Sequence, residues 1–160
     1  MLSYEELDKI LSYDPNTGEF TWKVDRKGGA YAGDKAGYYS QGYIKVCVFG
    51  KAQLAHRLAW VLHYKEEPPK VIDHINGDPL DNRVINLRAS SHKQNMQNRK
   101  KHSNGKSKYK GVSWSKASGK WQAQIQKRHI GLFLTQEEAA EAYNKEATKV
   151  FGLYSRLNTV

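Results

Sequence analysis

Cysteine is almost absent from this chain of 160 residues, in which Cys47 is the only one. A single thiol cannot form an internal disulfide, and it cannot supply the several cysteines that most structural zinc sites use. We therefore expect a protein of a reducing compartment, the cytoplasm, without structural zinc.

Long hydrophobic runs are absent as well. No apolar stretch approaches the roughly 20 residues that a membrane-spanning helix needs. The beginning of the chain carries Glu5, Glu6 and Asp8, where a signal peptide would have an apolar segment. The sequence therefore predicts no membrane partner.

Acidic residues are missing from one long segment. Between Asn82 and Gln136 there is no Asp or Glu, whereas thirteen Lys and Arg fall there, and the net charge of the chain is +10. A surface that is only solvated usually mixes both signs. Bases without acids predict binding to a polyanion by counterion release, with an affinity that falls as salt rises. They do not follow an amphipathic helix, which disfavours a membrane surface.

Residues 71–98 have the pattern of two short strands followed by a helix. A β-prone run opens the segment, turn-forming residues follow at 76–81, and a second β-prone run covers 84–88. Ser90 or Ser91 can then cap the first turn of a polar helix. The segment is predicted to fold as ββα.

The polar side chains of this segment suit the hydrolysis of a phosphodiester. Asp73, at the end of the first strand, and Asn95, on the helix, offer hard oxygen ligands for an ion such as Mg²⁺. His74 is then available to take a proton from water. Asn86 can fix the tautomer of His74, and Asn82 is the alternative for that role.

These residues resemble the HNH nuclease family, particularly the phage and intron homing endonucleases of the ββα-metal fold. The resemblance rests on Asp73-His74, Asn86 and Asn95, the last standing where the family name has histidine. It implies His74 and Asn86 as catalytic residues, with Asp73 and Asn95 as ligands of Mg²⁺, for which Mn²⁺ can substitute. The products would carry 5′-phosphate and 3′-hydroxyl ends.

The residues before this segment predict a scaffold. Their patterns indicate a short helix over 2–11, which a capping box of Ser3 and Glu6 can open, strands over 19–23 and 42–49, and a helix over 54–64. The last helix carries His56, which we interpret as a hydrogen-bonded core residue rather than a metal ligand. Whether this scaffold also contacts DNA stays open.

Residues 99–108 are basic and almost free of apolar side chains, which predicts a linker. Its Arg99, Lys100 and Lys101 are expected to contact DNA phosphates, as are Arg83 and Arg88 of the ββα segment. A solvated tether that only spaces two domains is the alternative.

Residues 109–158 predict a three-stranded antiparallel sheet packed on one helix. Apolar residues alternate around Val112 and Ala123, a third strand covers 130–134, and Thr135 opens the capping box of a helix. The sheet face away from the helix is expected to enter the major groove of DNA. The predicted DNA-binding residues here are Ser113, Ser115, Gln122, Gln124, Gln126, Lys127, Arg128 and His129.

This pattern is similar to the APETALA2-type DNA-binding domain, which also occurs fused to HNH homing nucleases. Residues 109–112, 130–133 and 137–143 carry the likeness. Where plant members present arginines, this sheet has serines and glutamines, so the target site of the plant proteins does not carry over.

Together the patterns predict an α+β chain of two domains. A ββα-metal nuclease domain with its scaffold is expected over 1–98, with the ββα core over about 71–98. The basic linker is expected over 99–108 and the APETALA2-like domain over 109–158.

The predicted function is that of a metal-dependent endonuclease of double-stranded DNA, of homing or phage type, in the cytoplasm of a bacterial host or a phage-infected cell. The alternative is a DNA-binding regulator whose HNH module is inert. RNA binding is disfavoured because the sheet offers few exposed aromatic residues. We expect a monomer, with a dimer on DNA as the alternative, and leave open whether one strand or both are cut.

Overall fold

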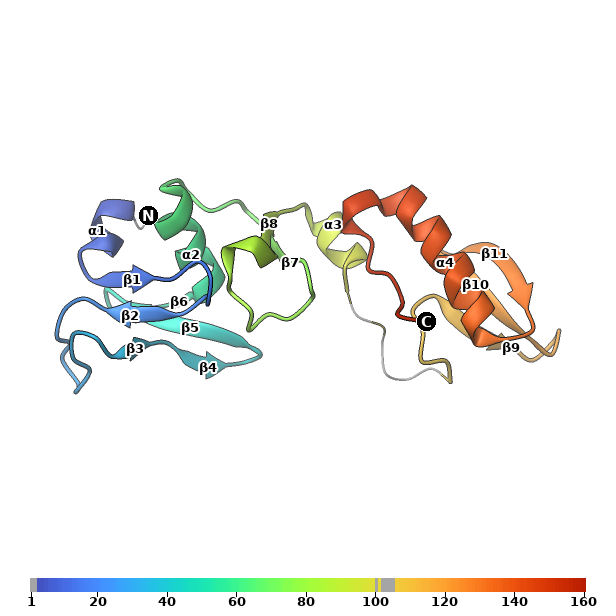
Figure 1. Cartoon of the computed structure of the whole chain (residues 1–160), viewed down its shortest axis with the longest axis horizontal. Coiled ribbons are helices and arrows are strands. Elements are labelled where there is room, and N and C mark those ends of the chain that lie inside the picture. Colours follow the sequence, from blue (N-terminus) through green and yellow to red (C-terminus); the bar gives the residue numbers. More distant parts are fainter. Residues whose placement is uncertain (1–2, 100, 102–105) are drawn as a thin grey trace. The chain divides into compact units, whose positions relative to one another are not determined.

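The computed structural model describes residues 3–99, 101 and 106–160, which divide into two compact units, one ending at Ser91 and the other beginning at His92. Lys100 and residues 102–105 of the predicted linker lie outside the described residues. The elements, in chain order, are α1 (Tyr4–Asp8), β1 (Leu11–Tyr13), β2 (Phe20–Trp22), β3 (Lys35–Ala36), β4 (Tyr38–Ser40), β5 (Tyr43–Val48), β6 (Lys51–Leu54), α2 (Ala55–Tyr64), β7 (Ile72–His74), the 3₁₀ turn η1 (Val84–Asn86), β8 (Leu87–Ala89), α3 (His92–Gln97), β9 (Val112–Ser115), β10 (Lys120–Ile125), β11 (Arg128–Phe133), α4 (Gln136–Phe151) and the 3₁₀ turn η2 (Gly152–Tyr154) (Figure 1).

Three small antiparallel sheets build the first unit. One has the strand order β1-β2-β3, the second has the order β4-β5-β6, and the third is the hairpin of β7 and β8. The fully buried side chains of its core come from α1, the strands and α2, and include Leu7, Leu11, Val46, Val48 and Leu58. This scaffold surrounds α2, which in turn contacts the segment of η1.

The N-terminal helix is shorter than the sequence suggested. Ser3 and Glu6 form the predicted capping box, in which each side chain accepts a hydrogen bond from the backbone N–H of the other residue. The helix ends at Asp8, and Leu11 begins a strand instead of continuing the helical stripe.

The second strand of the β7–β8 hairpin also differs from the prediction. The backbone N–H of Asn86 donates to the carbonyl of Arg83, and this 3₁₀ turn occupies the first half of the expected strand. Pairing with β7 begins only at Leu87 and ends at Ala89. Asn86 therefore belongs to the loop of the hairpin rather than to its ladder.

The second unit contains the predicted three-stranded sheet, in the order β9-β10-β11, and α4 covers one of its faces (Figure 1). The capping box of Thr135 and Glu138 opens α4 as expected. The third strand starts earlier than predicted because Gln126 and Lys127, with φ of 48° and 67°, make a tight two-residue turn.

Gly111 allows the start of the sheet to lie directly against α4. Its φ is 74°, and a Cβ there would stand 2.2 Å from Cδ2 of Tyr143, so a larger residue would be excluded. Asn158 holds the backbone of Lys110, next to Gly111. Its side chain accepts a hydrogen bond from the N–H of Lys110 at 2.7 Å and donates one to the carbonyl of Lys110 at 3.1 Å.

The boundary between the units lies before α3, whereas the predicted domain boundary lies after residue 98. Helix α3 contacts η2, and the carbonyl of Gln97 accepts a hydrogen bond from Lys110 Nζ, both within the second unit. No helix of the described residues is long and apolar enough to cross a membrane.

Candidate active site

The β7–β8 hairpin places Asp73 and His74 at neighbouring positions of a buried strand. Asp73 pairs with Arg88 and His74 with Leu87 across the ladder. Asp73 is 3% exposed and His74 is 7% exposed, so both polar side chains lie inside the unit. Polar side chains are stable in such a buried position only where they have hydrogen-bonding or charged partners.

Arg88 is the partner of Asp73. Its Nε and Nη2 donate to the same carboxylate oxygen, Oδ2, at 2.9 and 2.6 Å, and only 16% of the Arg88 side chain is exposed. Two charge-assisted bonds hold the carboxylate in one orientation. In this structure the Arg88 guanidinium faces Asp73. The expected contact of Arg88 with a DNA phosphate therefore stays a prediction.

His74 packs against a second buried histidine, His56 of α2. Their ring centroids are 5.1 Å apart and the ring planes are nearly perpendicular, at 88°. Tyr43 lies on the other side of His56, with a centroid distance of 5.9 Å. His56 is thus enclosed by other residues, as expected of a core histidine.

Both imidazoles are held in the neutral form. Burial lowers the pKa of His74, while the proximity of the Asn82 side chain and the charges of nearby aspartates oppose that shift. The pKa of His56 falls to about 3 through burial and the proximity of His74 and Arg57. A neutral His74 is the form that can accept a proton.

Asn82 and Asn86, the two candidates for orienting His74, have different roles. The Asn86 amide accepts from the N–H of Asn76 at 2.9 Å and donates to the carbonyl of Asp81 at 2.8 Å, so it fastens the hairpin loop. Asn82 is 3% exposed and lies next to His74, and its amide nitrogen donates to the carbonyl of Leu80 at 3.1 Å. Orientation of His74 by either asparagine stays a prediction.

The loop of the hairpin is tied to the scaffold at Asn82. Tyr13 donates its hydroxyl hydrogen to the carbonyl of Asn82 at 2.8 Å. Gly18, with φ of 76°, lies so close to the same backbone that a Cβ would stand 2.6 Å from the amide nitrogen of Arg83. The sequence offered no signal for these contacts, because they join residues far apart in the chain.

Arg83 and Asn95 complete the predicted set around the hairpin. Arg83 forms an exposed ion pair with Asp81, at 2.6 Å, and its contact with DNA stays a prediction. Asn95 lies on α3 of the second unit, so its joint role with Asp73 also stays a prediction. Among the residues that the structure describes, no three His, Cys, Asp or Glu side chains form a group that could hold a metal ion. The available donors, one carboxylate and one amide oxygen, suit a hard ion that keeps several waters.

The predicted DNA-binding residues of the second unit divide between two faces and a turn. Directly paired residues of a ladder share a face, so Ser113 opposite Gln122 and His129 opposite Gln124 lie on the face away from α4. Gln122 Nε2 and His129 Nδ1 are 3.0 Å apart on this face. Ser115 belongs to it by alternation along β9.

Arg128 corrects the prediction for this sheet. It pairs with Ile125, whose side chain is buried against α4, and its guanidinium forms an ion pair with Glu146 of that helix. Its side chain therefore points to the helix side rather than to the open face. Gln126 and Lys127 occupy the turn between β10 and β11 and are exposed.

The basic residues that follow α3 are described only in part. Arg99 is exposed, and its Nη1 lies 3.5 Å from the sulfur of Met96. Lys101 is half-buried, and Lys100 lies outside the described residues. Their contact with DNA phosphates stays a prediction.

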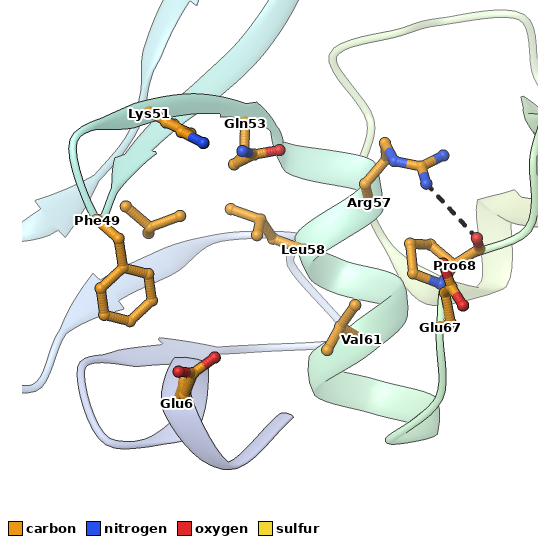
Figure 2. Close-up of a pocket in the computed structure, with 10 residues that line it drawn as sticks. Glu6, Phe49, Lys51, Gln53, Arg57, Leu58, Val61, Glu67 and Pro68 are labelled. Atoms are coloured by element: carbon orange, nitrogen blue, oxygen red, sulfur yellow. Dashed lines mark hydrogen bonds between the residues drawn. The ribbon is translucent and has the colours of Figure 1, made fainter. Parts of the chain in front are cut away.

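A cavity of about 440 Å³ lies elsewhere in the first unit, between α1, the β5–β6 turn and α2 (Figure 2). Glu6 and Glu67 face Lys51 and Arg57 around an apolar floor, and Arg57 donates to the carbonyl of Pro68 at 3.5 Å. None of the predicted site residues lines it. The scaffold cavity is thus separate from the histidine pair.

Comparison with known proteins assigns part of the chain. Residues 53–97, which include α2, the β7–β8 hairpin and α3, match the model of the family described as HNH endonuclease.

Three curated proteins resemble the chain over about a third of its length. Protein 3.8 of Escherichia phage T7 is 41% identical over 54 residues, which cover 34% of this chain and 45% of that protein. The AP2-like ethylene-responsive transcription factors CRL5 of rice and AIL5 of Arabidopsis thaliana are each 44% identical over 62 residues, covering 35% of this chain and 10% and 11% of those proteins. The chain thus spans less than half of each of these relatives, and its residues 53–97 carry an HNH endonuclease domain.

Proposed function

We propose that this protein is a metal-dependent endonuclease that hydrolyses phosphodiester bonds of double-stranded DNA, of homing or phage type. The observation that carries the proposal is His74, a buried imidazole kept neutral beside Asp73 on the hairpin of an HNH domain. HNH nucleases generally use divalent metal ions, and the phage T7 relative supports the phage origin.

His74 would act as the general base. Its neutral ring would take a proton from water, and the resulting hydroxide would attack phosphorus in line with the departing 3′ oxygen. Asn82, which lies next to the ring, would help to orient it, and His56 would limit the ring's rotation by its edge-on packing.

Asp73 and Asn95 would hold the divalent ion, which is expected to be Mg²⁺, with Mn²⁺ as a substitute. When bound, such an ion neutralises charge on the phosphate and on the leaving oxygen. Because Arg88 donates twice to Oδ2 of Asp73, the ion would share this carboxylate with the guanidinium.

The same ion pair supports a second candidate function, a DNA-binding regulator with an inert HNH module. A carboxylate already neutralised by arginine has less need of a cation, and two of the relatives are described as transcription factors. Both functions need DNA contact by the open face of the β9–β11 sheet, so DNA binding alone does not separate them.

Cleavage of supercoiled plasmid and genomic DNA fragments tests the proposal. We expect nicks or cuts that require Mg²⁺ or Mn²⁺, disappear with a chelator, and leave 5′-phosphate ends. His74→Ala should slow cleavage by about 10²- to 10⁴-fold, the range for loss of a general base, with DNA affinity preserved.

His63→Ala is the matched control, because this histidine lies on the exposed side of α2 and should cleave like the parent protein. If the parent protein binds these DNAs but cuts none of them with either metal, the regulator is the correct function.

A further inference from the structure

The second unit contains a cavity of about 560 Å³ that no predicted role explains. Helix α3, the residues before β9, the end of β10 with its turn, and α4 enclose it. Its volume lies within the range of about 300–1,000 Å³ that is typical of small-molecule sites.

The floor of this α3–α4 cavity is apolar. Ile125 and Tyr143 are 3% exposed and belong to the packing between the sheet and α4, and Phe151 is half-buried beside them. Met96 of α3 lines the cavity with 59% of its surface exposed. These side chains offer a surface on which a flat apolar group can lie.

The charged side chains around the floor are positive. Lys93, Lys110 and Lys127 line the cavity, and no acidic side chain does. Lys110 is half-buried, and one hydrogen bond of its ammonium goes to the carbonyl of Gln97. Burial and the charge of Arg156 lower the pKa of Lys110 to about 8, and a bound anion would offset both effects.

Amide groups supply the remaining polarity. Gln97 and Gln126 bring amide side chains to the cavity beside the lysines. An amide side chain offers donors and an acceptor together, as the edge of a nucleobase requires. An anionic group, a flat ring and a hydrogen-bonding edge are the three parts of a nucleotide.

We propose that the α3–α4 cavity binds a single nucleotide, with its phosphate among Lys93, Lys110 and Lys127 and its base on the apolar floor. An acidic amphipathic peptide would also find lysines and an apolar floor here. The amide set favours the nucleotide, and so does the inclusion of Gln126 and Lys127 in the surface proposed to face DNA. The proposal does not depend on cleavage by the first unit.

Calorimetric titration of the full chain tests the site with dAMP, inorganic phosphate and deoxyadenosine. Because both halves of the ligand would be bound, dAMP should bind about tenfold or more tightly than either fragment. Lys110→Met should weaken dAMP binding by about tenfold or more, the usual effect of losing a charged hydrogen bond.

Two further variants make this result specific. Lys93→Met removes a charge from an exposed position of α3 and should also weaken dAMP binding, without the folding risk of changing the half-buried Lys110. Lys145→Met, on the exposed side of α4 and outside the cavity, should leave dAMP binding unchanged.

The source of the nucleotide is found by comparing a blunt duplex with one that carries a short single-stranded 3′ end. Tighter binding of the overhang that dAMP abolishes identifies a nucleotide of a DNA strand. Equal binding of both duplexes, together with tight dAMP binding, identifies a free nucleotide. The proposal is overturned if dAMP binds no more tightly than its fragments, or if Lys145→Met weakens dAMP binding as much as Lys110→Met does. It is also overturned if a Glu-Leu repeat peptide binds the cavity more tightly than dAMP.

Discussion

In the first unit, the residues proposed for catalysis, His74 and Asn86, are buried, whereas in the second unit the residues proposed to read DNA lie on an open sheet face. Asp73 and His74 are almost inaccessible to water, but Ser113 and Gln124 are exposed. Burial shifts pKa values and fixes orientation, which suits a proton transfer. An exposed amide keeps its hydrogen-bonding groups available for another molecule, which suits recognition.

The largest effect is expected where this contrast is greatest, at the buried Arg88–Asp73 pair. Arg88→Met removes both hydrogen bonds of the guanidinium to a buried carboxylate and should lower the free energy of unfolding of the first unit by about 3–5 kcal/mol, as for other broken buried pairs. Urea denaturation at pH 7, followed by circular dichroism, measures it.

The matched control is Arg83→Met, which breaks a pair whose arginine side chain is 47% exposed and whose aspartate is partly buried, and it should lower the stability much less. Adding Asp73→Asn to the Arg88 variant should recover much of the loss, because no buried charge then remains. Equal destabilisation by the two arginine substitutions would contradict the distinction between a buried and a more exposed pair.

On the open face, single substitutions should change DNA binding without changing stability. Gln124→Ala should weaken binding to the preferred sequence, found by selection from random DNA, by about 1–3 kcal/mol, which is the usual size of one base contact. Arg128→Ala should have a much smaller effect, because its guanidinium is engaged by Glu146 on the helix side. Fluorescence anisotropy with labelled duplexes measures both, and a larger loss for Arg128→Ala would place DNA on the other face.

A further effect, spread over several pH units, concerns His56 and appears as a pH dependence. Its pKa is about 3 in the folded protein and near 6.5 when unfolded, so the unfolded chain binds more protons between these values. The free energy of unfolding should therefore fall as pH is lowered from about 6.5, by up to about 1.4 kcal/mol per pH unit from this group.

His74, whose pKa is also lowered, adds to the slope in the same direction. His56→Phe keeps the ring packing and should make the decrease in stability between pH 6.5 and pH 4 shallower. Denaturation curves at several pH values test this, and an unchanged slope would show that His56 is protonated in the folded protein.

Local signals in the sequence predicted those parts of the fold that depend on neighbouring residues. The capping boxes at Ser3 and Thr135 and the alternation around Ala123 involve groups only a few residues apart, and the structure contains each of them. The short strands β1, β3, β4 and β6 were not predicted, because two to four residues carry too little periodicity and the pairing is decided elsewhere in the chain.

The candidate site was predictable in its residue types but not in its contacts. That Asn82 lies next to His74 while Asn86 holds the hairpin loop depends on a loop whose 3₁₀ turn replaces the first half of the expected strand. The position of Arg128 depends on strand register, since β11 begins right after a two-residue turn and brings Arg128 opposite the buried Ile125. Such register follows from turn geometry, which the residue pattern alone does not reveal.

The turn at Gln126 and Lys127 affects the stability of the hairpin and the binding of a ligand in opposite directions. Both residues have left-handed backbone angles, which disfavour non-glycine residues by about 1–2 kcal/mol each, and Asn-Gly is the pair that such hairpin turns prefer. Replacing both residues with Asn-Gly should therefore strengthen the hairpin while shortening one amide side chain and removing an ammonium group from the rim of the α3–α4 cavity. A more thermostable version of this protein obtained at that turn would be expected to bind its nucleic-acid ligand less well.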